Sequence, residues 1–128
     1  MSESFLIRGA RLAGSDATDM LVIDGTIAEV GTGLRARGAT VVDADGLIAL
    51  PGLVDLHTHL REPGFEASET ILTGSRAAAA GGFTTVFAMP NTSPVADTAG
   101  VVEQELALGE AAGYVHVQPI GAVTIGQK

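Results

Sequence analysis

The sequence predicts an α/β protein in which part of a small β domain, residues 1–50, precedes a series of strands and helices, residues 51–128. Two observations carry this prediction. Before residue 50, short apolar runs are separated by glycine-bearing turns, which is typical of β-hairpins. After residue 51, apolar strands alternate with longer helical segments, which is typical of parallel βα units.

The β domain is expected to be a small antiparallel module built from two hairpins. Asp-Gly between two apolar runs is a strong signal for a two-residue hairpin turn. Two such pairs occur: Asp24-Gly25 between residues 20–23 and 26–30, and Asp45-Gly46 between residues 40–44 and 47–50. Because isolated hairpins are only marginally stable, the apolar faces of this module need a cover.

The second part of the chain is expected to contain three strands and two helices. The strands are predicted at residues 52–59, 83–89 and 114–123, and the helices at residues 68–80 and 98–112. Ser68 is the expected N-cap of the first helix, and Asp97 or Thr98 that of the second. Glycines after each helix mark its end.

Length and composition limit the possible functions. A complete barrel of eight βα units needs about 250 residues, so the 128 residues are expected to be an N-terminal part that is inactive alone. The net charge of −8 argues against nucleic-acid or anionic membrane partners, and the lack of cysteine excludes disulfides and thiolate metal sites. No apolar run approaches a membrane span and no signal peptide is recognisable, so a cytoplasmic protein is expected.

The stretch that carries chemistry begins at Pro51. With a period of two, Leu53, Asp55, His57 and His59 share one face of the first strand. Polar groups at the carboxyl end of a buried strand are typical of the active face of a parallel α/β barrel. Two histidines at i and i+2 there can reach one metal ion, and the sequence therefore predicts a metal site. Asp55 is expected either to orient an imidazole or to have a structural role.

Three further residues are candidates. Arg61 follows the first strand, where a guanidinium can hold a carboxylate through two parallel hydrogen bonds, although a solvated surface arginine is the plainer interpretation. Asn91 follows the second strand, where its amide can donate and accept, although asparagine is also a common turn residue. His116, in the third strand, is expected to be structural or exposed.

Two blocks resemble class I dihydroorotases of the amidohydrolase superfamily. They are Asp-Leu-His-Thr-His-Leu-Arg-Glu-Pro-Gly, residues 55–64, and the segment from Gly81 to Thr92 with Gly-Gly-Phe-Thr-Thr and Ala-Met-Pro-Asn-Thr. The resemblance implies a metal-dependent (β/α)8 barrel preceded by part of a small β-sandwich domain. It also implies one or two zinc ions held by His57 and His59, and a substrate carboxylate held by Arg61 and Asn91. The general acid/base, an aspartate in the family, is expected after Lys128, so no catalytic residue is expected in this chain.

The activity implied by the resemblance is the reversible cyclisation of N-carbamoyl-L-aspartate to dihydroorotate in pyrimidine biosynthesis. A related cyclic amidohydrolase, an allantoinase or a hydantoinase, is the first alternative. Arg61 and Asn91 argue against it, because those substrates lack the carboxylate. The second is a non-catalytic dihydroorotase-like partner of aspartate carbamoyltransferase. A homo-oligomer or an association with that transferase is the expected assembly.

Overall fold

The computed structural model describes residues 3–13 and 15–127. It divides into two compact units, Met1–Pro51 and Gly52–Lys128, next to the residue at which the sequence pattern changes. Each unit has its own sheet and its own buried cluster. Among the described residues, no helix is long and apolar enough to span a membrane.

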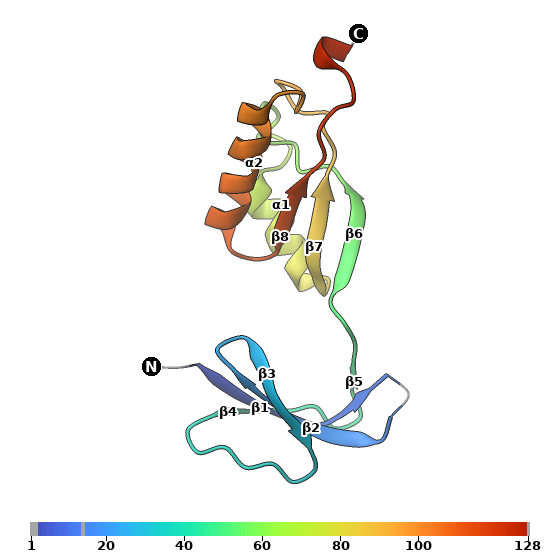
Figure 1. Ribbon diagram of the computed structural model, residues 1–128, viewed down its shortest axis with the longest axis vertical. Coiled ribbons are helices and arrows are strands. Elements are labelled where there is room, and N and C mark those ends of the chain that lie inside the picture. Colours follow the sequence, from blue (N-terminus) through green and yellow to red (C-terminus); the bar gives the residue numbers. More distant parts are fainter. Residues whose placement is uncertain (1–2, 14, 128) are drawn as a thin grey trace. The chain divides into compact units, whose positions relative to one another are not determined.

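The first unit is a five-stranded sheet (Figure 1). Its strands are β1 (Ser4–Leu12), β2 (Ala17–Ile23), β3 (Thr26–Gly31), β4 (Thr40–Asp43) and β5 (Ile48–Ala49). β1, β2 and β3 form an antiparallel meander. The hairpin at Asp24-Gly25 is confirmed, since both residues have positive φ angles, 48° and 77°, as a type I′ turn requires.

The hairpin predicted at Asp45-Gly46 is wrong. In the described part of the chain, β4 and β5 both pair with β1, in parallel, rather than with each other. β1 has a register shift between Ile7 and Ala10, and Gly9 in this irregularity approaches Asp45 closely. The Asp-Gly turn therefore carries the chain past the bulge without reversing it, and the module is a mixed sheet.

The second unit is a three-stranded parallel sheet with both helices on one face (Figure 1). Its elements are β6 (Leu53–Thr58), α1 (Ile71–Ala80), β7 (Phe83–Ala88), α2 (Ala99–Ala112), β8 (His116–Pro119) and a short 3-10 turn (Ile125–Gln127). The buried cluster between helices and sheet consists of Leu60, Ile71, Val86, Ala88 and Val117. The strand–helix alternation of the prediction is confirmed.

The helix starts differ in part from the prediction. α1 begins at Ile71 because Thr70 and Thr73 form a capping box, in which each side chain accepts from the backbone N–H of the other at 3.1 and 3.0 Å. Ser68 lies in the preceding turn. α2 is capped at Thr98, while Asp97 accepts a hydrogen bond from Gly126 N at 2.7 Å. β8 is also shorter than predicted.

Candidate functional site

The carboxyl ends of β6 and β7 bring three of the four predicted site residues together. The ring centroids of His57 and His59 lie 5.1 Å apart, with the rings at 67° to each other. His59 Nδ1 lies 2.9 Å from Oδ1 of Asn91, which comes just after β7. An amide oxygen only accepts, so Nδ1 of His59 is the donor in this contact, and in the neutral imidazole Nε2 is then the acceptor.

A bulge in β6 changes which residues share a face. Asp55 pairs with Val86 and Thr58 pairs with Ala88, so one more residue of β6 than of β7 lies between these pairs. Asp55 and Thr58 consequently both line a small hollow against α1. The prediction that Asp55 shares the face of the histidines is therefore wrong. Its Oδ1 accepts from the backbone N–H of His57 at 3.0 Å, so Asp55 holds the bulged backbone.

The loop after β6 carries Arg61 in a constrained backbone. Arg61 is half-buried, has a φ of 62°, and its carbonyl accepts from Phe65 N at 2.9 Å. The left-handed region costs a residue with a side chain about 1–2 kcal/mol. A residue held there by its surroundings is often functional. Arg61 is also the only Lys or Arg between residues 51 and 75.

Two of the three glutamates in this loop accept hydrogen bonds from backbone N–H groups. Glu62 Oε2 accepts from the N–H of Ile71, at the start of α1, at 2.7 Å. Glu66 Oε1 accepts from Gly64 N at 2.7 Å, and backbone hydrogen bonds, first that from Gly64, lower the pKa of Glu66. Both carboxylates thus support the loop that presents Arg61.

The loop after β7 contacts the loop after β6 and, through Thr92, the buried carboxyl group of Glu105. Ser93 N donates to Pro63 O at 2.9 Å, which joins the two loops directly. Below them, Thr92 Oγ1 donates to Pro94 O at 2.7 Å and lies 3.4 Å from Oε1 of Glu105 in α2. Glu105 is completely buried.

The environment of Glu105 favours its neutral form. Burial raises the pKa of Glu105 to about 7, while the hydrogen bond with Thr92 lowers it. The hydroxyl of Thr92 is the donor to both Oε1 of Glu105 and Pro94 O, so its single proton is shared between two acceptors. Sequence reasoning missed Glu105, although its spacing of four from Val101 and from Gly109 on the buried side of α2 was a usable signal.

Two histidines alone are too few ligands for a metal site. In residues 3–13 and 15–127, no group of three or more His, Cys, Asp or Glu side chains is placed to hold a metal ion. Zinc in proteins is almost always four-coordinate, and a catalytic site uses about three protein ligands. The imidazoles of His57 and His59 are suitable donors, and further ligands must come from elsewhere.

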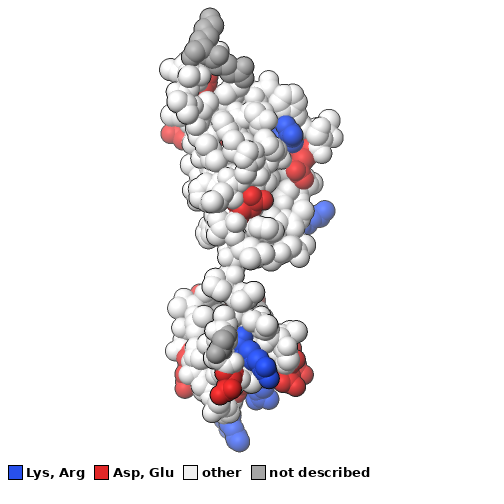
Figure 2. All heavy atoms as spheres, turned by 90° about the vertical axis from the view of Figure 1, so that its right-hand side faces the viewer, with Lys and Arg blue, Asp and Glu red and all other residues white. Residues whose placement is uncertain are grey.

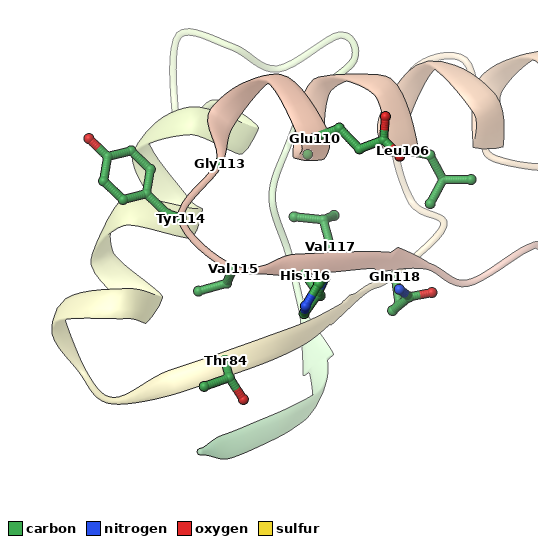
Figure 3. Close-up of a pocket in the computed structure, with 10 residues that line it drawn as sticks. Thr84, Leu106, Glu110, Gly113, Tyr114, Val115, His116, Val117 and Gln118 are labelled. Atoms are coloured by element: carbon green, nitrogen blue, oxygen red, sulfur yellow. The ribbon is translucent and has the colours of Figure 1, made fainter. Parts of the chain in front are cut away.

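His116 lies apart from this cluster. It is exposed at the amino end of β8, whereas His57 and His59 lie at the carboxyl end of the parallel strand β6. Figure 3 shows it beside a groove between β8 and α2, on the opposite side of the strand from Val117. This placement agrees with the expectation that His116 is structural or exposed.

Comparison with known proteins shows which family shares these features. Residues 46–128 match the family model described as dihydro-orotase-like. The dihydroorotase of Leifsonia xyli subsp. xyli is 74% identical over 124 residues, 97% of this chain and 28% of that protein. The dihydroorotase of Streptomyces coelicolor is 69% identical over 122 residues, 94% of this chain and 28% of that protein. The chain thus spans less than a third of these relatives.

Solved structures confirm the predicted fold class. The L-hydantoinase (dihydropyrimidinase) of Arthrobacter aurescens superposes with a TM-score of 0.80 at 26% identity, covering 98% of this chain and 29% of that one. N-isopropylammelide isopropylaminohydrolase of Burkholderia multivorans superposes with a TM-score of 0.69 at 25% identity, and the match covers 95% of this chain and 38% of that one. The mixed α/β architecture of this chain is therefore shared with part of the fold of these amidohydrolase proteins.

Proposed function

This chain belongs to the dihydro-orotase-like family, and we propose that the protein of which it forms part is a dihydroorotase. The reaction is the reversible cyclisation of N-carbamoyl-L-aspartate to dihydroorotate, in pyrimidine biosynthesis. The observation that carries the proposal is the contact between His59 and Asn91, which joins the candidate metal ligands to the candidate substrate loop. The high identity to dihydroorotases along nearly the whole chain supports it.

His57 and His59 are the proposed zinc ligands, for one or two ions. The hydrogen bond of His59 Nδ1 to an amide oxygen is the kind of outer contact that orients a metal-binding imidazole and leaves Nε2 for the metal. When bound, zinc would lower the pKa of a coordinated water to about 7 and polarise the ring carbonyl. The two residues therefore fit the metal that the family implies.

Arg61 and Asn91 are the proposed partners of the substrate carboxylate. Since Oδ1 of Asn91 is occupied by His59, its NH₂ group remains as a donor, and a carboxylate is an acceptor. Arg61 can add two parallel hydrogen bonds from its guanidinium. Holding the carboxylate from both loops would fix the ring and direct its reactive amide toward the imidazoles.

The alternatives are less well supported. The hydantoinase structure is 26% identical to this chain, far below the dihydroorotase relatives, and hydantoins and allantoin have no carboxylate for Arg61 to hold. A non-catalytic homologue that only supports aspartate carbamoyltransferase has no need of the metal ligands, yet both histidines are present. Assembly with that transferase, a homo-oligomer and a cytoplasmic location remain predictions.

The substitution Arg61→Met in the complete protein tests the carboxylate assignment. Hydrogen bonds to charged groups contribute roughly 1.5–3 kcal/mol each. At 1.36 kcal/mol per decade, we expect kcat/KM for dihydroorotate to fall on the order of tenfold to a hundredfold. The much slower turnover of 5,6-dihydrouracil, which lacks the carboxylate, should barely change.

Arg76→Met is the matched control, because Arg76 is exposed on α1. It should leave both substrates unaffected. Equal losses for the two substrates in Arg61→Met would mean that Arg61 acts on the fold or the metal, and the carboxylate assignment would be wrong. A complete wild-type protein that converts neither substrate would contradict the proposed function itself.

A further inference from the structure

The loops that carry Arg61 and Asn91 meet at a contact that only glycine permits. Gly64 has a φ of 100°, and a Cβ placed on it would overlap the carbonyl oxygen of Ser93 and lie 2.6 Å from the Ser93 Cβ. Real Cβ atoms essentially never come within 3.0 Å of another atom in this way. The obstacle includes backbone, so a side-chain rotation cannot remove it.

Hydrogen bonds fix this contact from both sides. Pro63 O accepts from Ser93 N at 2.9 Å, and Gly64 N donates to Glu66 Oε1 at 2.7 Å. Gly64 and Ser93 are therefore held at the joint between the two loops. Arg61 lies three residues before the glycine and Asn91 two residues before the serine, so the joint limits how far apart these two side chains can move.

We propose that Gly64 is a positioning residue for substrate specificity, because its close contact with Ser93 sets the spacing between Arg61 and Asn91. The inference rests on the proposed function, in which these two residues hold the substrate carboxylate. A larger residue at position 64 pushes residues 90–94 away from the first loop. The carboxylate then cannot reach both partners at once, and the loss of a charged hydrogen bond weakens substrate binding.

The test is Gly64→Ala in the complete enzyme, with Gly82→Ala as the matched control. Gly82 also has a left-handed backbone, φ 84°, but a Cβ there would meet nothing within 4 Å. Both variants therefore introduce backbone strain, and only the first introduces the overlap. We expect KM for dihydroorotate to rise on the order of tenfold to a hundredfold in Gly64→Ala, with a smaller change in kcat and in 5,6-dihydrouracil turnover. Gly82→Ala should keep the wild-type KM.

Two results would overturn the inference: an unchanged KM in Gly64→Ala, or the same increase in both variants. If Gly64→Ala does not fold, Ser93→Gly takes its place, since it loosens the same joint without adding atoms. Its KM for dihydroorotate should rise several-fold relative to Ser68→Gly, a loop control, and no difference between these two would also overturn the inference. One further outcome separates this inference from the proposed function. If the wild type is active, Arg61→Met loses the preference for the substrate with the carboxylate and Gly64→Ala keeps it, then only the inference about Gly64 is contradicted.

Discussion

At the scale of single residues, the amide of Asn91 is proposed to make two contacts, one with His59 and one with the substrate. Its amide oxygen is already committed to His59, so whatever it offers a ligand comes from its NH₂ group. In the proposed function, the orientation of an imidazole and the recognition of a substrate thus share one side chain. Replacing Asn91 would disturb both, so the histidines and Arg61 are better targets for separating metal binding from substrate binding.

The metal assignment predicts a loss of zinc when both imidazoles are removed. In the complete protein, His57→Ala with His59→Ala should lower the zinc content per protomer sharply, because the variant lacks both imidazoles proposed as zinc ligands. His116→Ala is the control, since this histidine is exposed at the opposite end of the sheet. Unchanged zinc stoichiometry in a folded double variant would contradict the assignment.

The buried Glu105 predicts a pH dependence of stability. Its pKa is raised from 4.5 to about 7 in the folded protein, so the fold favours the protonated form. The contribution of this group is fully present below its unfolded pKa and is lost as the pH rises through about 7. Glu105→Gln stays neutral and should therefore become more stable relative to wild type between about pH 5 and pH 8.

Melting temperatures measured across this range check the prediction for Glu105. Glu103→Gln is the control, because Glu103 is exposed on the same helix. Its melting curve should follow the wild type at every pH. A constant difference between Glu105→Gln and wild type across the range would show that folding does not raise the pKa of Glu105.

At the scale of elements, the helices approach the sheet through glycine. A Cβ on Gly109 of α2 would lie 2.6 Å from the Cβ of Val117, whereas one on Gly100 of the same helix would meet nothing within 4 Å. Alanine is more favourable than glycine in a helix by about 1 kcal/mol, but overpacking costs about 1–3 kcal/mol. We expect Gly100→Ala to raise the melting temperature and Gly109→Ala to lower it. A stabilising Gly109→Ala would show that α2 can move away from β8 at little cost.

The elements also show what sequence patterns could and could not predict. The alternation of strands and helices was predicted correctly, because apolar periodicity and glycine stops are local signals. The same Asp-Gly pair makes a hairpin after residue 23 but not after residue 44. The difference lies in the strand with which each segment pairs. β4 and β5 both pair with β1, and no local sequence pattern specifies that pairing. The bulge that turns Asp55 toward α1 is likewise a property of the register with β7.

The sequence names the members of the candidate site, which stay predictions, but it does not predict their contacts. His57, His59, Arg61 and Asn91 come from short motifs at strand ends, and strand order alone brings such ends to one edge of a sheet. The link between His59 and Asn91, the joint at Gly64 and the support from Glu105 depend on loop conformation and on packing between distant segments. Such contacts are formed only in the folded structure and leave no pattern in the sequence.

At the scale of the whole molecule, large apolar side chains remain exposed in both units. In β6, Leu53, Val54 and Leu56 are 48%, 52% and 69% exposed, and in the first unit Ile27, Val41 and Ile48 are more than half exposed. Figure 2 shows mainly uncharged atoms on the side of the second unit that it presents. Exposed apolar surface of this extent marks a binding interface or an aggregation hazard.

We therefore expect residues 1–128, produced alone, to be inactive and to associate or to bind a hydrophobic dye. Dye fluorescence and light scattering measured against the complete protein at equal concentration check this. The complete protein should bind less dye per mole, because the apolar strand β6 would be covered by the rest of the barrel. A monomeric piece with a cooperative melting transition and no dye binding would contradict the expectation.

The central place of β1 bears on the order in which the first unit assembles. β1 pairs with β2 across a short connection, whereas its pairing with β4 joins residues far apart in the chain, such as Phe5 and Thr40. Closing a longer loop costs more entropy, and parallel pairing requires such a crossover. The meander of β1, β2 and β3 is thus the natural folding nucleus of this unit. β4 and β5 would dock last along its open edge, and their amides would be the first to exchange with solvent.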